Sequence, residues 1–150
     1  MYEFVSYSGS VQNPTGGDWP SAPGAVRFDE QFRPLLAHFA PGRWLAPEPS
    51  PQTLAFLNDA AGSGAGTLVD VTGKWDAIRI CGPGSVRLLA CTINCEVMLE
   101  NRDCAAATLF DCPAILMRTS DGFSAWVQSS YTGHFLATAE QFRIALETAD

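Results

Sequence analysis

Residues 69–90, VDVTGKWDAIRICGPGSVRLLA, decide the fold. Ile78 and Ile80 alternate with Arg79 and Cys81, which is the pattern of a half-buried β-strand over DAIRIC. The glycine-rich CGPGS turn follows this strand. Beyond it, apolar side chains recur at the i, i+3, i+4 and i+7 spacing of an amphipathic helix: Val86, Leu89, Ala90 and Ile93. The stretch therefore predicts a strand, a Gly-Pro turn and a helix in direct succession.

A glycine-rich turn between a strand and a helix can also bind phosphate, so the CGPGS turn has two interpretations. The dinucleotide fingerprint requires a third glycine at the position that Arg87 occupies here, and a Walker loop requires a Gly-Lys-Ser/Thr ending that this turn lacks. Pro83 suits a helix start, because the N–H that proline lacks has no partner at the first turn of a helix. We therefore expect a connector and not an anion site.

Turn residues on either side of this stretch predict two β-hairpins. In LAHFAPGRWLA, residues 36–46, Pro41 presets φ for the first central position of a turn and Gly42 permits a positive φ at the second. In PAILMRTSDGFSAWVQ, residues 113–128, the Asp121-Gly122 pair supplies the turn. Both hairpins place strands next to each other in sequence and in space.

Two further helices complete the predicted elements. Ser50 suits an N-cap and Pro51 the first helical position of a helix whose apolar face holds Leu54, Leu57 and Ala61. The C-terminal segment places four apolar side chains on one helical face: Phe135, Ala139, Phe142 and Leu146. We expect an α+β domain of β-hairpins with helices on one sheet face, in an arrangement that is ferredoxin-like.

The N-terminal residues have a different composition. Residues 8–24 are rich in Gly, Pro and Ser and cannot bury enough apolar surface to fold alone. Four aromatic residues nevertheless occur before residue 20, and we predict them as contacts with a partner subunit: Tyr2, Phe4, Tyr7 and Trp19. We expect an extended arm over residues 1–24, which is either a mobile tail or lies across a partner, and a single domain over residues 25–150.

Composition excludes several classes of partner. The 150 residues carry a net charge of −7, whereas nucleic acids and anionic membranes require a basic surface. No apolar run is long enough to span a bilayer, and the first ten residues lack the apolar core of a signal peptide. Five cysteines without an export signal indicate reduced thiols, so we expect a cytoplasmic protein.

No catalytic, cofactor-binding or metal-ligating residue is predicted. The cysteines form no C-x-x-C pair, and we expect buried thiols without metal at Cys91, Cys95, Cys104 and Cys112. Only His38, in a predicted strand, and His134, at a predicted helix start, could supply an imidazole base. No serine lies in a G-x-S-x-G elbow, and no carboxylate pair has the spacing for acid–base catalysis. Taken alone, the residues favour a non-catalytic domain.

The order of motifs from residue 41 onward resembles the gamma subunits of heterotetrameric sarcosine oxidases, which are related to the folate-binding aminomethyltransferase fold. Four segments carry the resemblance over about two-thirds of the chain: PGRWLAPEP (41–49), DVTGKWDAIRICGPGSVRLL (70–89), CEVML (95–99) and AAATLFDCPAILMRTSDGFSAWVQSSY (105–131). The chain departs from the family at Ala107-Thr108, where an Arg-Thr pair is usual, and at residues 127–130, where Pro-x-Arg-Ser is usual.

This resemblance implies an aminomethyltransferase-like fold and a subunit that carries no cofactor of its own. Larger companion subunits would hold FAD, FMN, NAD and tetrahydrofolate, and a small subunit would hold zinc. The complex would oxidatively demethylate a secondary amine such as sarcosine, giving formaldehyde or methylene-tetrahydrofolate. Two alternatives remain open: a stand-alone folate-binding or one-carbon-transfer protein, with Asp70 or Asp76 facing the pterin, and a thiol-based metal or redox protein.

Overall fold

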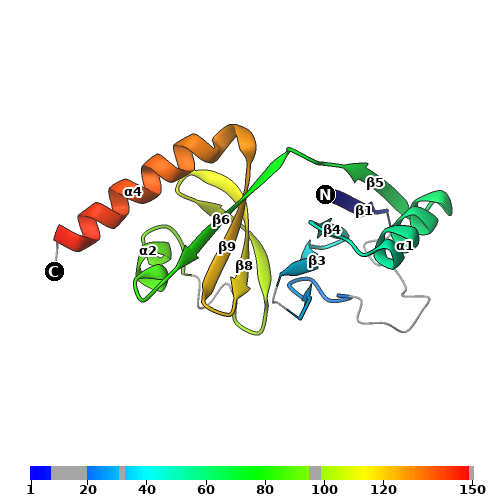
Figure 1. Cartoon of the computed structure of the whole chain (residues 1–150), viewed down its shortest axis with the longest axis horizontal. Coiled ribbons are helices and arrows are strands. Elements are labelled where there is room, and N and C mark those ends of the chain that lie inside the picture. Colours follow the sequence, from blue (N-terminus) through cyan, green and yellow to red (C-terminus); the bar gives the residue numbers. More distant parts are fainter. Residues whose placement is uncertain (8–19, 31–32, 95–98, 149–150) are drawn as a thin grey trace. The chain divides into compact units, whose positions relative to one another are not determined.

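The chain forms two compact units in a computed structural model, which describes residues 1–7, 20–30, 33–94 and 99–148. The first unit contains residues 1–72 and 102–104, and the second contains residues 73–101 and 105–150. Each unit has its own sheet (Figure 1). The sequence predicted an arm over residues 1–24 and one domain over residues 25–150. The structure differs because the N-terminal residues enter the sheet of the first unit.

The first unit is a five-stranded antiparallel sheet with the strand order β2-β3-β4-β1-β5. One helix, α1, packs against it. The elements are β1 (Tyr2–Ser6), β2 (Val26–Phe28), β3 (Pro34–Ala40), β4 (Arg43–Ala46), α1 (Pro51–Gly62) and β5 (Gly66–Asp70).

Strand β1 lies between β4 and β5 and pairs with both along its length. Phe4 is 1% exposed, and its ring packs beside Trp44 with ring centroids 5.9 Å apart. On the other side of Trp44, the His38 ring stacks at 4.1 Å. The register places Phe4 opposite Trp44 and Trp44 opposite His38, so the three rings form a row across β1, β4 and β3. This aromatic row and α1 form the core of the unit.

The local predictions for this unit are confirmed. Strands β3 and β4 are joined by Pro41 and Gly42, and Gly42 has a φ of 69°. Helix α1 begins with Ser50 as its N-cap, whose hydroxyl accepts a hydrogen bond from the Thr53 N–H at 3.1 Å. Pro51 occupies the first turn. Each feature follows from the conformational preference of one residue, which is why the sequence predicts it correctly.

The second unit is a four-stranded sheet with the order β6-β9-β8-β7 and helices α2 and α4. The elements are β6 (Trp75–Cys81), α2 (Ser85–Ala90), β7 (Cys104–Leu109), β8 (Cys112–Thr119), β9 (Gly122–Gln128), a 3-10 turn (Ser129–Tyr131) and α4 (Thr132–Thr148). Leu89 of α2 and Phe135 of α4 pack with Phe123 of β9 in one core, so both helices cover the same sheet face. The predicted α+β class is confirmed.

Two boundaries differ from the sequence prediction. Helix α2 ends at Ala90, so the predicted stripe is only partly buried: Leu89 is buried, whereas Val86 is exposed. The loop between β8 and β9 consists of Ser120 and Asp121, and Gly122 already pairs with Thr119. Sequence patterns locate such elements well and their ends less well, because the last turn of a short helix is set by tertiary contacts.

The turn that joins β7 to β8 was not predicted from the sequence. Phe110 and Asp111 both have positive φ, 48° and 61°, which is a type I′ geometry usually built from Asn and Gly. Each such residue costs about 1–2 kcal/mol. The Phe110 ring is buried and meets Phe135 edge-on at 5.1 Å and Phe142 at 5.8 Å. Burial and aromatic contacts of this kind contribute about 2–5 kcal/mol, so they offset the strain.

We predict that Gly66→Ala destabilises the first unit by about 1–3 kcal/mol. A Cβ at Gly66 would lie within 3.0 Å of both the Val5 carbonyl oxygen and the Phe4 ring, and a backbone oxygen in a paired strand cannot move aside. Urea unfolding of both variants measures the effect against Gly62→Ala, where the added Cβ meets nothing within 4 Å. Equal stability of the two variants would contradict this account.

Candidate functional site

The four aromatic residues predicted as a partner interface have different environments. Phe4 belongs to the core row, and Tyr2 packs partly buried against the same core. Tyr7, one residue beyond β1, is 71% exposed. Trp19 lies outside the described residues. The structure therefore assigns Phe4 to the interior instead of the surface, because alternate side chains of a strand point to opposite faces of the sheet. Tyr7 keeps the exposure that an interface residue needs.

The surface around Tyr7 continues onto the edge strand β5. The Tyr7 hydroxyl lies 2.5 Å from the Thr67 hydroxyl oxygen, and the Tyr7 N–H donates to the Ala65 carbonyl at 3.0 Å. Val69, two residues further along β5, is exposed as well. The tyrosine is thus held in place while its ring stays in solvent. We call Tyr7, Thr67 and Val69 the β5-edge surface.

An ion pair between a buried carboxylate and an exposed arginine joins β1 and β4. Glu3 is only 5% exposed, and the Arg43 guanidinium donates two hydrogen bonds to one of its carboxylate oxygens. The Arg43 guanidinium also lies 5.0 Å above the centre of the Phe39 ring. Sequence patterns gave no sign of this pair, because the two residues are 40 positions apart. A paired carboxylate of this kind fixes the strands in register and is poorly placed for catalysis.

The CGPGS turn connects β6 to α2, as predicted. Gly82 has a φ of 94°, which allows the chain to reverse, and its carbonyl accepts a hydrogen bond from the Ser85 N–H at 3.1 Å. Gly84 follows with an ordinary φ of −90°. The turn therefore uses the Ser85 N–H for its own closure, whereas a phosphate loop directs such groups at the ligand.

The thiols are divided between interior and surface. Cys104 and Cys112 are buried, as expected, and burial raises the pKa of the Cys104 thiol to about 12. Cys91 and Cys81 are exposed, so the expectation of burial is wrong for Cys91, which caps the end of the short helix α2. Cys95 lies outside the described residues. Within the ranges that the structure describes, no three His, Cys, Asp or Glu side chains come together as a metal site.

The two histidines differ in accessibility. His38 lies in β3, as predicted, and is 1% exposed. His134 lies near the start of α4, as predicted, and its side chain is exposed. A general base has to reach the proton that it removes, and His38 is enclosed by the core of the first unit.

Asp70 and Asp76, the carboxylates considered for a pterin, are both hydrogen-bonded within their own units. Asp70 accepts a hydrogen bond from the Thr72 N–H at 2.9 Å, and hydrogen bonds from Thr72 lower the pKa of the Asp70 carboxyl. Asp76 accepts hydrogen bonds from the Ser129 hydroxyl at 3.0 Å and the Thr132 hydroxyl at 2.6 Å, which join β6 to the start of α4. Asp76 thus has a structural role at a helix start.

The second unit contains an open groove of about 510 Å³ between β6, α2 and α4. Its apolar lining includes Ile78, Ile80, Leu88, Phe135, Leu136 and Leu146. Strand β6 is an edge of the sheet, so one row of its backbone N–H and C=O groups borders the groove without a strand partner in the described sheet. This groove was not predicted, because it depends on how β6, α2 and α4 pack together.

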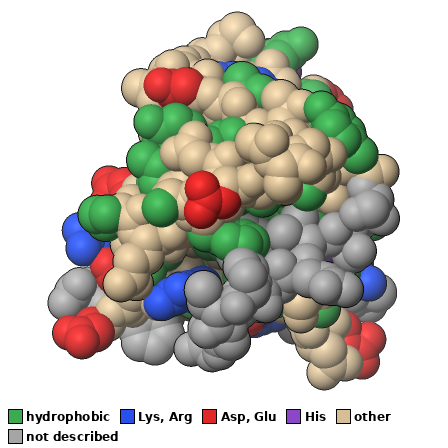
Figure 2. Space-filling model, turned by 90° about the vertical axis from the view of Figure 1, so that its right-hand side faces the viewer, with side chains coloured by type: hydrophobic (Ala, Val, Ile, Leu, Met, Phe, Trp, Pro, Cys, Tyr) green, Lys and Arg blue, Asp and Glu red, His purple; other side chains and the backbone are tan. Residues whose placement is uncertain are grey.

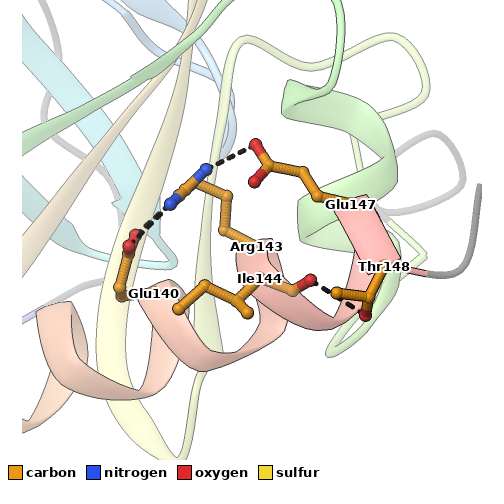
Figure 3. A network of polar contacts seen from close by, with 5 residues as sticks. All are labelled: Glu140, Arg143, Ile144, Glu147 and Thr148. Carbon is orange, nitrogen blue, oxygen red and sulfur yellow. Dashed lines mark hydrogen bonds and ion pairs between the residues drawn. The ribbon is translucent and has the colours of Figure 1, made fainter.

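Charged side chains of α4 border the groove. Arg143 donates to both carboxylate oxygens of Glu140 at 2.7 Å and also to Glu147 (Figure 3). These ion pairs lower the pKa of the Glu140 carboxyl and raise that of Arg143. They are exposed, so solvent screening keeps their contribution to stability small. Elsewhere on the surface, hydrophobic side chains are interspersed with charged and polar groups on the face in Figure 2.

These features define an α+β protein of two antiparallel sheets, with the exposed β5-edge surface on the first unit and an open groove on the second. No protein-family model and no curated protein sequence matches the chain. Among solved structures, the chain is similar to a chain of the heterotetrameric sarcosine oxidase from Corynebacterium sp. U-96 in complex with pyrrole 2-carboxylate. The TM-score is 0.72 with 20% sequence identity, over 94% of this chain and 77% of that chain. The likeness establishes the fold and confirms the resemblance seen in the sequence.

Helices of the described residues include none that is long and apolar enough to cross a membrane.

We predict opposite effects for the two glycines of the CGPGS turn. Gly82→Ala lowers the free energy of unfolding by about 1–2 kcal/mol, because an alanine strains at a φ of 94°. Gly84→Ala is neutral or raises it by up to about 1 kcal/mol, since φ is −90° and the added Cβ meets nothing within 4 Å. Thermal and urea unfolding measure both variants. A large loss of stability for Gly84→Ala would show that this turn is built differently.

Proposed function

We propose that the chain is a non-catalytic structural subunit, of the gamma type, in a heteromeric flavin-dependent sarcosine oxidase or a related N-methyl amino-acid oxidase or dehydrogenase. The observation that carries this proposal is the fold shared with a chain of a heterotetrameric sarcosine oxidase over 94% of the present chain. The order of motifs from PGRWLAPEP to the final hairpin supports it independently, because that order was evident in the sequence.

In the proposed complex, the chemistry belongs to partner subunits. Larger subunits hold FAD, FMN, NAD and tetrahydrofolate, and a small subunit holds zinc. The complex oxidatively demethylates a secondary amine and yields formaldehyde or methylene-tetrahydrofolate, in the cytoplasm. The local chemistry of this chain supports such a division of labour: His38 is enclosed, and Asp76 holds the start of α4. A stand-alone folate-binding function has less support, because Asp70 and Asp76 are both hydrogen-bonded within the chain.

For the partner surface, we propose the β5-edge surface with Tyr7 at its centre. Among the described members of the aromatic set, Tyr7 is the exposed one, and β5 is an edge strand whose backbone groups can accept a further strand. Tyrosine is also enriched among the residues that dominate binding energy at protein interfaces. Phe4, by contrast, supports this surface from inside the sheet.

Co-expression of the tagged chain with its neighbouring open reading frames tests the proposed assembly. We expect the purified chain to bring down larger subunits with the visible absorbance of flavin, in a fixed stoichiometry. Oxidation of sarcosine or another N-methyl amino acid by that material identifies the amine. Recovery of the chain as a lone monomer, with flavin subunits that assemble and turn over without it, would refute the proposal.

We predict that Tyr7→Ala weakens retention of the partner subunits by about 1–2 kcal/mol or more, the range of an interface hot spot, with little change in the stability of the free chain. Tyr7→Phe separates the ring from the hydroxyl that contacts Thr67. The matched control is Tyr131→Ala, an exposed tyrosine of the second unit. Surface plasmon resonance with immobilised partners measures the loss. Equal retention of the Tyr7→Ala and Tyr131→Ala variants would remove Tyr7 from the interface.

A further inference from the structure

One carbonyl in the first unit accepts two side-chain hydrogen bonds. The Trp44 indole N–H donates to the Pro20 carbonyl oxygen at 3.1 Å, and His38 Nδ1 lies 3.1 Å from the same oxygen. A carbonyl oxygen only accepts, so Nδ1 carries the proton of the neutral imidazole. Pro20 is itself buried. Two rings of the aromatic row thereby hold the beginning of the loop over residues 20–25 against the sheet.

The rest of this loop is attached through the backbone. The Gly24 N–H donates to the His38 carbonyl at 2.6 Å, and the His38 N–H donates to the Ala25 carbonyl at 3.0 Å. The Gly24 carbonyl accepts from the N–H groups of Asp103 and Cys104. Residues 24 and 25 therefore have several attachments, whereas at Pro20 the described side-chain bonds come from His38 and Trp44.

The second nitrogen of His38 makes the attachment sensitive to protonation. His38 Nε2 is buried and has no hydrogen-bond partner. A proton added there places a positive charge on a residue that is 1% exposed. The stacked Trp44 ring attracts an imidazolium, and backbone hydrogen bonds to Pro20, Ser21, Ala22 and Ala40 raise the pKa of His38, so both oppose this effect. Burial is nevertheless the larger influence and lowers the pKa of His38.

We propose that His38 and Trp44 form a pH-sensitive latch: a neutral His38 holds Pro20 against the sheet of the first unit, and protonation of His38 releases it. The sign follows from linkage. Attachment lowers the pKa of His38 below the ordinary histidine pKa of about 6.5. Its stabilising contribution is therefore fully present above that ordinary pKa. The contribution is lost as the pH falls toward the lower pKa of the attached state.

Among the described residues, the charged groups near the latch lie outside the loop itself. The loop over residues 20–25, PSAPGA, has no ionisable side chain. Arg43 of β4 lies on the opposite sheet face from Trp44 and pairs with Glu3, and Arg27 of β2 is exposed.

On the other side of the loop, the Cys104 thiol contacts the His38 carbonyl, and its pKa of about 12 keeps it neutral. Arg102 lies beside Gly24, and Asp103 bonds to the Gly24 carbonyl through its N–H. Among the described residues, His38 is the ionisable side chain that is hydrogen-bonded to Pro20.

The Trp44 indole N–H is the reporter for the test. In ¹⁵N-labelled full chain, with this signal assigned by Trp44→Phe, hydrogen exchange of the indole is measured from pH 7.5 to 5, alongside the ¹³C–¹H signal of the His38 ring. We expect a protected indole at neutral pH that loses its protection as His38 titrates, with a midpoint below the ordinary histidine value. His134→Phe, which removes the exposed histidine, should leave the response unchanged.

His38→Phe keeps a ring to stack on Trp44 but has nothing to protonate, so its indole should show the same protection at both ends of the range. If that variant does not fold, His38→Gln, which is uncharged and retains a donor, serves in its place. The proposal is overturned if the variant keeps the pH response of the native chain, or if His38 titrates while the indole stays protected. Because only the free chain is used, failure here leaves the proposed subunit role intact, and the reverse also holds.

Discussion

The first unit depends on the position of the Trp44 side chain. Its ring touches Phe4 on one side and His38 on the other, and its indole N–H fixes Pro20. One residue therefore joins three strands and a loop whose positions in the sequence are far apart. Gly66 is required in the neighbouring strand because the Phe4 ring occupies the space that a side chain would need. The N-terminal strand is held in the sheet by this packing, and that position separates a buried Phe4 from an exposed Tyr7.

In the second unit, packing of the Phe110 ring offsets the backbone strain at the same residue. The positive φ of Phe110 turns its side chain into the space where Phe135 and Phe142 of α4 meet the sheet. Asp76, Ser129 and Thr132 hold the beginning of the same helix. Helix α4 is anchored at these points and forms one side of the groove beside β6, and its exposed ion pairs lie along that side.

Elements whose geometry is determined by a single residue could be predicted from the sequence. Pro41-Gly42, Ser50-Pro51 and the alternation around Ile78 and Ile80 each gave the correct element, and the order of such elements gave the fold. Strand β1 was not predicted, because YEFVS pairs with strands about 40 and 65 positions away in the sequence. The Gly-rich residues that follow it favoured the prediction of an extended arm. The Phe110-Asp111 turn was not predicted because neither residue normally favours positive φ. The contacts of Pro20, His38 and Trp44 were not predicted because the three residues come from separate segments.

The assignment of residues 102–104 to the first unit means that the two units are interleaved along the chain. During synthesis the first unit lacks the N–H groups of Asp103 and Cys104 until β6 and α2 of the second unit have been made. Until then, the Gly24 carbonyl lacks these two hydrogen-bond donors. Neither unit can therefore be excised as one continuous piece without including part of the other. A fusion or split-protein design has to treat residues 1–104 as the shortest contiguous segment that contains the whole first unit.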